Sequence, residues 1–425
     1  MSNEKLESKR WVIAGAAVVM QILLGSVYAW SVYKKPLMGT HGWSEFATQL
    51  TFMICIGVIG VSAAFGGILV DKKGPKFVAT IGGILFGLGT LIAGYAAQSG
   101  STILMYLGFG IIAGLGNGFG YVTPIATLIR WFPDKRGLVT GLAVMGFGLG
   151  AFFVGKLAPD MIASFSADSK VPDAKGVAMT LYIFGGIFLV LVTASAQFYN
   201  NPPAGWLPTG FTPSAKTTSA ADSFNLPQAL STPQWWMLWG MLFLNVSAGL
   251  GLLSQLSPMA QAVVGKDDPK LLTDPKALAA AGGFILAIAS IFNGLGRLFW
   301  ASVSDKIGRK MVFIIMFATQ GVLYVVMPEI ANVTLFTIIA CYLLACYGGG
   351  FATMPAFAAD SFGPANIGRV YGTMLTAWGA AGIAGPLVFA LEALKGKSLY
   401  VAAGMLAAGF VLSILYKRPA LRKAA

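Results

Sequence analysis

Long apolar blocks run through most of this chain and constrain its fold more than any other feature. About 20 helical residues cross a ~30 Å hydrocarbon core, and twelve blocks reach or approach that length. Inside a bilayer only helices and closed barrels satisfy their backbone hydrogen bonds, and these blocks lack the alternation of barrel strands. Charged residues make up 11% of the chain, against roughly 25% in soluble domains. The sequence therefore predicts an all-α polytopic membrane protein.

Polar interruptions divide the apolar blocks into two groups of six expected transmembrane helices. The first group covers residues 11–33, 46–70, 77–97, 102–129, 138–157 and 177–198, and the second covers 235–262, 278–303, 311–327, 332–358, 370–391 and 398–416. Residues 199–234 are rich in Pro, Ser, Thr and Gly, which is typical of a linker. We expect an N-terminal half over 1–198, a cytoplasmic linker over 199–234, and a C-terminal half with a short cytoplasmic tail over 235–425.

The net charge of +13 is distributed as in a membrane protein. Most of the 29 Lys and Arg residues fall in segments on the side that would hold both termini. The positive-inside tendency then predicts cytoplasmic termini and a multi-pass protein of the plasma (inner) membrane. The first block is too long for the core of a signal peptide, so we interpret it as a retained helix. Nucleic-acid binding is not expected.

Arg297 lies inside the apolar run "SIFNGLGRLFWASVSDKIGRK", residues 290–310, with no acidic residue near it before Asp305. A charge at membrane depth costs from about 2.5 to more than 10 kcal/mol. Eight residues separate it from Asp305, or about 12 Å of helix, which places it near the bilayer midplane. A guanidinium fits a carboxylate with two parallel hydrogen bonds. We therefore predict an anion site here; an arginine that snorkels or caps carbonyl groups is the alternative.

A short charged loop recurs after the second helix of each half. It reads "GILVDKKGPK" at residues 67–76 and "ASVSDKIGRK" at 301–310. An Asp can accept from helix N-termini or basic groups, and a Gly allows a tight reversal. We predict a role in conformational change for the loop residues Asp71, Gly74, Asp305, Gly308 and Arg309.

This loop resembles the pattern G-x-x-x-D-[RK]-x-G-[RK]-[RK] of the major facilitator superfamily. Its first copy matches the pattern at Gly67, Asp71, Lys72, Gly74 and Lys76, while Pro75 departs from it. The resemblance covers nearly the whole chain. It implies two six-helix halves that enclose a central site and rock around it.

Longer stretches resemble the oxalate/formate antiporter family within that superfamily. They are "GSVYAWSVY" (25–33), "RWFPDKRGL" (130–138), "TPQWWMLW" (232–239), "FNGLGR" (292–297) and "YGGGFATMPAFAADSFG" (347–363). In the family's oxalate carrier, an Arg of helix 8 and a Lys of helix 11 bind the two carboxylates. The Arg corresponds to Arg297, but Trp378 stands where the Lys would be. One cation balances one carboxylate, so this departure favours a monocarboxylate over oxalate.

The resemblance also implies an aromatic surround for the substrate, formed by Tyr28, Tyr121, Tyr347 and Phe351, with Trp378 beside them. Tyrosine hydroxyls can donate to a carboxylate while the rings exclude water; lipid-facing positions are the alternative. Asn293, one turn before Arg297, shares its helix face and could orient it or the ligand. A hydrogen bond between helices is an equal alternative for Asn293.

An enzyme is not expected, because the only histidine, His41, falls in a predicted outward loop and no span carries a carboxylate pair. Cys55, Cys341 and Cys346 lack metal-binding spacing, and we predict no metal and no cofactor. The stretch "GLGNGFG" satisfies a loose G-x-G-x-x-G but follows no strand, so it indicates close helix packing.

These features together predict a secondary active transporter that moves small monocarboxylates (lactate, pyruvate or formate) by alternating access, with Arg297 binding the carboxylate. Oxalate:formate antiport is the alternative. Without an acidic neighbour for Arg297, exchange of one anion for another is favoured over symport with protons. The expected partners are the small anion and the lipid bilayer, with protons as an open alternative, and we expect a monomer.

Overall fold

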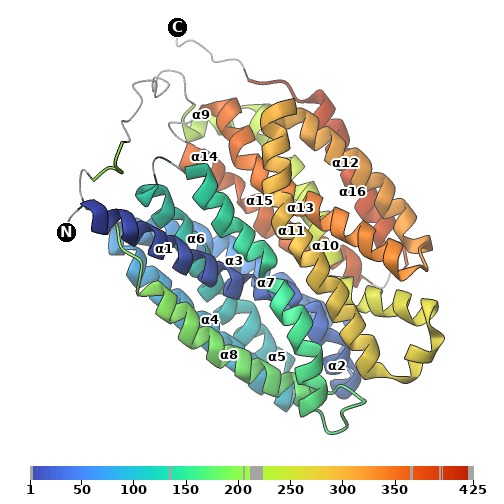
Figure 1. Cartoon of the computed structure of the whole chain (residues 1–425). Coiled ribbons are helices and arrows are strands. Elements are labelled where there is room, and N and C mark those ends of the chain that lie inside the picture. The colour runs from blue at the N-terminus through green and yellow to red at the C-terminus, as the bar shows by residue number, and fades with distance from the viewer. Residues whose placement is uncertain are drawn as a thin grey trace.

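The computed structural model describes residues 3–132, 134, 136–203, 206–210, 224–363, 367–391, 394 and 396–419. These residues form a bundle of long helices (Figure 1). Twelve helical stretches among them are long and apolar enough to cross a membrane. The predicted all-α fold with twelve transmembrane helices is therefore confirmed.

The N-terminal half supplies the first six spans. Its elements are α1 (Asn3–Leu24), the 3₁₀ segment η1 (Gly25–Ala29), α2 (Ser31–His41), α3 (Glu45–Lys73), α4 (Pro75–Ser99), α5 (Thr102–Met105), the π-helical segment η2 (Tyr106–Ala113), α6 (Gly114–Trp131), α7 (Arg136–Phe165) and α8 (Ala174–Ala196). The first span continues through η1 into α2, so His41 ends a helix instead of lying in a loop. Its Nε2 atom lies 2.7 Å from the Ala97 carbonyl oxygen.

The C-terminal half supplies the other six spans. Its elements are α9 (Leu226–Leu230), α10 (Pro233–Asp267), the 3₁₀ segment η4 (Pro269–Thr273), α11 (Pro275–Ile307), α12 (Arg309–Val326), the 3₁₀ segment η5 (Met327–Glu329), α13 (Val333–Phe362), α14 (Ile367–Met374), α15 (Thr376–Ala390) and α16 (Ser398–Leu415). The short α9 lies within the expected linker. Two spans begin with a polar cap and a proline, which favour helix initiation: α10 at Thr232 and Pro233, and α11 at Asp274 and Pro275.

The two halves meet mainly along two helix pairs, α7 with α11 and α3 with α15. Glycines allow the backbones to approach closely at both contacts. A Cβ atom on Gly155 would lie 2.9 Å from the Gly283 carbonyl oxygen, and one on Gly60 would lie 2.8 Å from Gly379 Cα. Small residues are the usual means of close helix packing in membranes.

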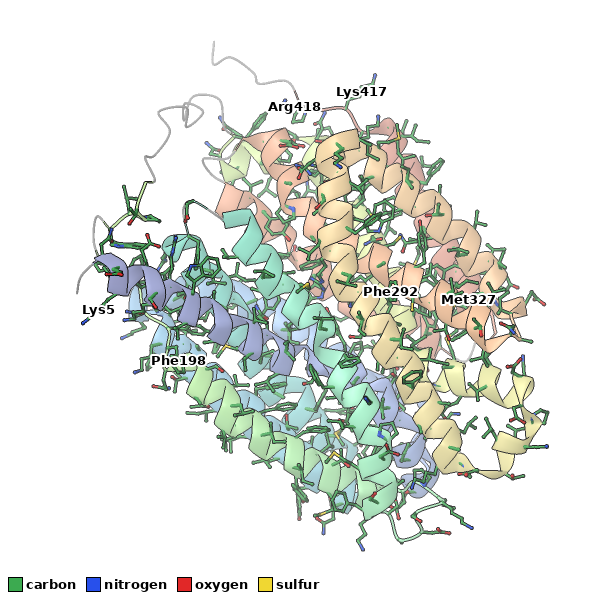
Figure 2. All side chains as sticks on the ribbon, in the orientation of Figure 1. Lys5, Phe198, Phe292, Met327, Lys417 and Arg418 are labelled. Carbon is green, nitrogen blue, oxygen red and sulfur yellow. The ribbon has the colours of Figure 1, made fainter. Side chains whose placement is uncertain are left out.

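The outer faces of the helices carry large apolar side chains. Phe65, Val190 and Val322 are each more than 60% exposed, which suits contact with lipid rather than with water. Lys5 near the start of α1 and Lys417 and Arg418 after α16 lie at the same end of the bundle (Figure 2). We call this end the terminal end and the other the opposite end.

The repeated charged loops have the same backbone shape in both halves. Gly74 separates α3 from α4 with φ +83° and ψ 158°, and Gly308 separates α11 from α12 with φ +89° and ψ 148°. Such positive φ values strain any residue with a Cβ. The side chain of Asp71 lies outside the described residues. In the second copy Arg309 pairs with Asp305 and, at 3.2 Å, with Asp360 of α13, so this loop joins three helices.

Candidate anion-binding site

A break in the first span positions Tyr28. The chain tightens into η1 at Gly25, where a Cβ atom would lie 2.0 Å from the Phe147 carbonyl oxygen of α7. Asn117 of α6 donates to the Leu24 carbonyl oxygen at 2.8 Å, just before the break. The glycine-rich stretch around Asn117 is therefore a packing motif, as predicted. Tyr28 is 2% exposed in the interior between the two halves.

Helix α11 carries Arg297 between α7 and α13. A Cβ atom on Gly148 of α7 would lie 3.0 Å from Arg297 Nε, and one on Gly296 would lie 2.3 Å from the Ala345 carbonyl oxygen of α13. Ser290 donates to the Gly148 carbonyl oxygen at 2.8 Å. The guanidinium group therefore lies where the two halves meet.

Arg297 is buried without an acidic partner. It is 2% exposed, and its Nε and Nη1 atoms have no hydrogen-bond partner. No ion pair joins it to a carboxylate among the described residues. Its Cζ atom lies 5.3 Å from the centre of the Phe351 ring, a cation–π distance. A cation–π contact does not take the place of hydrogen bonds, so two donor atoms of this buried cation stay unsatisfied.

The predicted aromatic residues form one cluster around this arginine. The Tyr28 and Tyr347 hydroxyl groups lie 2.7 Å apart, and Trp378 packs at 5.3 Å between ring centres on both Tyr121 and Phe351. All of these side chains are at most 5% exposed. The structure thus brings Tyr28, Tyr121, Tyr347, Phe351 and Trp378 together around Arg297 from both halves of the chain.

Phe147 of α7 also belongs to the cluster, although we did not predict it from the sequence. Its ring centre lies 5.1 Å from that of Tyr28 and 5.0 Å from that of Tyr121, edge to face in both cases. It lies within the glycine-rich stretch "GFGLG", residues 146–150. The feature of the sequence that could have indicated its place in the cluster is its position directly before Gly148, the residue of α7 that approaches Arg297.

Several polar atoms in the cluster lack partners. Trp378 Nε1 and the Nε and Nη1 atoms of Arg297 are buried without a hydrogen-bond partner. Arg297 acts electrostatically on Tyr28, Tyr121 and Tyr347. The site therefore offers several hydrogen-bond donors and one positive charge.

Asn293 is fully buried, and both atoms of its amide lack hydrogen-bond partners. A Cβ atom on Gly348 of α13 would lie 2.6 Å from Asn293 Oδ1 and 3.1 Å from Arg297 Cγ. Asn293 thus lies beside the arginine at the α11–α13 contact. The alternative prediction of a hydrogen bond between helices is not met among the described residues.

A second polar group joins the halves at the opposite end of the bundle. Buried Lys34 pairs with Glu45 and donates to Gln49 Oε1 at 2.9 Å. Gln255 of α10 also donates to Glu45, and Lys35 donates to Gln261 Oε1 at 2.8 Å. These contacts hold α2 and α3 against α10.

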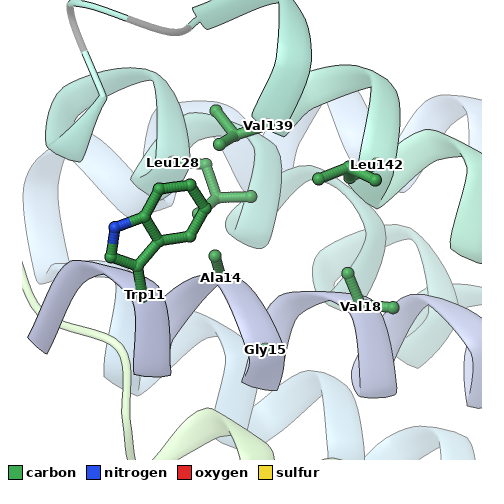
Figure 3. A pocket seen from close by; sticks show the side chains of 7 residues that line it. All are labelled: Trp11, Ala14, Gly15, Val18, Leu128, Val139 and Leu142. Atoms are coloured by element: carbon green, nitrogen blue, oxygen red, sulfur yellow. The ribbon is translucent and has the colours of Figure 1, made fainter. Parts of the chain in front are cut away.

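An apolar hollow lies apart from this site, between α1, α6 and α7 (Figure 3). It is lined by Trp11, Ala14, Gly15, Val18, Leu128, Val139 and Leu142. None of these side chains carries a charge, so the hollow does not suit a carboxylate. No cluster of potential metal ligands occurs among the described residues.

Twelve helices long and apolar enough to cross a membrane, in two halves with the buried guanidinium of Arg297 between them, define a transporter. The model of the Major Facilitator Superfamily matches residues 13–386 and 269–425. The chain belongs to this superfamily and is a transporter, not an enzyme.

Known proteins similar to this chain include two carriers of small acids. It is 29% identical to the oxalate:formate antiporter of Oxalobacter formigenes, over 89% of this chain and 84% of that protein. It is 28% identical to the apicoplast pyruvate carrier 1 of Toxoplasma gondii, over 72% of this chain and 62% of that protein. In fold it is similar to a bacterial homologue of the human lysosomal transporter Spinster, with a TM-score of 0.71, 14% identity and 96% coverage of both chains.

Proposed function

We propose that this protein is a secondary active carrier of small monocarboxylates such as lactate, pyruvate or formate, with Arg297 as the carboxylate anchor. The observation that carries the proposal is the buried guanidinium, whose Nε and Nη1 atoms lack partners within an aromatic cluster. A carboxylate would satisfy these donors and neutralise the charge. The surrounding rings would exclude water and so strengthen the pairing.

The number of positive charges at the site indicates how many carboxylates the substrate carries. One cation meets one carboxylate at no net charge, whereas oxalate would leave one negative charge buried, which is costly. Trp378 occupies the position where the oxalate carrier places its lysine, and its indole group is uncharged. Lys34 cannot supply the missing charge, because Glu45 already pairs with it at the opposite end.

Exchange of one anion for another is the proposed mode of transport. An empty carrier would have to close over the unpaired Arg297, while a loaded carrier closes over a neutral pair. The residues before Arg297 are Asn293, Gly294, Leu295 and Gly296, and none of them can carry a proton at neutral pH. The charge distribution supports cytoplasmic termini and linker, with the terminal end facing the cytoplasm.

Oxalate:formate antiport is the second candidate. The similarity to the antiporter of Oxalobacter formigenes over most of both chains favours it. The tyrosine hydroxyl groups and Trp378 Nε1 could then act as neutral donors to a second carboxylate. The absence of a second cation opposes this candidate.

Uptake of labelled L-lactate into proteoliposomes preloaded with unlabelled lactate tests the proposal. We expect rapid counterflow by the wild type and at least about a thirtyfold loss in Arg297→Gln, since truncating a buried charge pair costs about 2–5 kcal/mol. Lys276→Gln, in the first turn of the same helix, is the matched control and should keep transport.

Two results would contradict the proposal. Normal counterflow by Arg297→Gln would show that another residue binds the anion. If empty and preloaded vesicles took up lactate equally and an imposed acid gradient drove this uptake, the mode of transport would be proton symport and not exchange.

A further inference from the structure

The indole N–H of Trp378 is an unused donor in the centre of the molecule. Trp378 is 1% exposed, and its Nε1 atom has no hydrogen-bond partner. Other buried indole groups do have partners: those of Trp30, Trp131 and Trp235 donate to the carbonyl oxygens of Thr48, Asn200 and Val370. Since proteins pair nearly all buried donors, an unpaired one beside an unpaired cation points to a ligand.

The position of Trp378 relative to Arg297 defines what this donor can reach. Phe351 lies next to both side chains. The centre of its ring is 5.3 Å from Arg297 Cζ and 5.3 Å from the centre of the Trp378 ring. A ligand held by Arg297 would therefore have a neighbouring atom within reach of the indole.

We infer that Trp378 Nε1 donates a hydrogen bond to an oxygen on carbon 2 of the substrate while Arg297 holds its carboxylate. The inference rests on the proposed function and narrows it to short 2-oxo and 2-hydroxy monocarboxylates. An indole N–H only donates, and both carbonyl and hydroxyl oxygens accept. Acids of the same length without an oxygen at carbon 2 leave this donor unpaired and bind more weakly.

The competition test uses acids that differ in this one group. Proteoliposomes containing the full-length protein and unlabelled pyruvate exchange it for labelled pyruvate, and unlabelled pyruvate, L-lactate or propionate is added outside as competitor. We expect pyruvate and lactate to compete about tenfold more tightly than propionate in the wild type, the effect of one buried hydrogen bond.

Trp378→Phe removes the N–H group and keeps an aromatic ring. We expect this variant to bind pyruvate and propionate with similar affinity, because only pyruvate loses a bond. Trp235→Phe is the matched control: Trp235 is equally buried at 1%, but its N–H already donates to Val370. This control should keep the tenfold preference even if its stability falls.

Three outcomes would overturn the inference. If pyruvate and propionate compete equally in the wild type, the inference fails, and the proposed monocarboxylate function is unaffected. This experiment needs no variant. The same follows if Trp378→Phe weakens both acids equally, since the indole would then bind the carboxylate. Failure of the wild type to exchange any monocarboxylate would overturn the proposed function and this inference together.

Discussion

The hydroxyl groups of Tyr28 and Tyr347 lie 2.7 Å apart and join the two halves of the protein beside Arg297. Tyr28 comes from η1 in the first half and Tyr347 from α13 in the second. Alternating access requires the halves to move relative to one another around the site. The proposed alternating access therefore predicts that this bond forms and breaks during transport.

A double-mutant cycle of Tyr28→Phe and Tyr347→Phe measures this contact. We expect a coupling of about 1 kcal/mol in the free energy of unfolding, because either single change already removes the bond. The free energy of unfolding of the double variant should then be close to that of the less stable single variant. Reversible denaturation in detergent provides the measurement, and strictly additive effects would contradict the contact.

Gly148 determines how closely α7 approaches the anchoring arginine. An alanine there would place a Cβ atom 3.0 Å from both Arg297 Nε and Gly294 Cα. We expect Gly148→Ala to raise the KM for the monocarboxylate severalfold by displacing the guanidinium. The KM of counterflow exchange checks this.

Gly186→Ala is the control for that change, since a Cβ atom there meets nothing within 4 Å. It should leave KM unchanged. An unchanged KM in Gly148→Ala would show that the arginine is free to shift without loss of binding.

The contacts of Gln255 and Gln261 at the opposite end predict a shift in the carrier's conformation. Each joins α10 to the first half, through Glu45 and Lys35 respectively. Replacing either by Ala should increase the population open at this end about fivefold, if each bond contributes about 1 kcal/mol. The opening is measured in a variant that lacks the three buried native cysteines and carries Ser254→Cys. The rate at which a membrane-impermeant maleimide labels this new cysteine reports the opening.

Gln228→Ala in α9 is a suitable control, because the Gln228 side chain accepts from the Asn225 backbone N–H within the capping box of its own helix. It should leave labelling unchanged. Equal labelling of Ser254→Cys with and without the Gln255 and Gln261 changes would show that these bonds do not hold the end closed.

The sequence predicted the helical architecture because membrane burial requires long, uninterrupted apolar helices, which leave a clear pattern. The placement of Arg297 at the centre followed from a simple count along one helix. The helix boundaries were less exact: α11 runs to Ile307, four residues beyond the expected end of the eighth span. Charged residues at helix ends extend into the interface, where apolarity no longer marks the helix.

The partners within the site were harder to predict than its anchor. Phe147 joins the cluster because α7 and η1 approach closely at Gly25, a contact between segments over a hundred residues apart. The unpaired N–H of Trp378 likewise depends on which way a side chain points. Spacing along one helix does not carry such information, although it did place Asn293 beside Arg297.

The measurement that tests the central claim most directly is counterflow of labelled L-lactate and labelled oxalate, each into proteoliposomes preloaded with the same unlabelled acid. One arginine facing one carboxylate predicts rapid lactate counterflow and little oxalate counterflow, both lost in Arg297→Gln. Rapid oxalate counterflow without lactate counterflow would contradict the charge balance and show that neutral donors of the aromatic cluster replace the second cation.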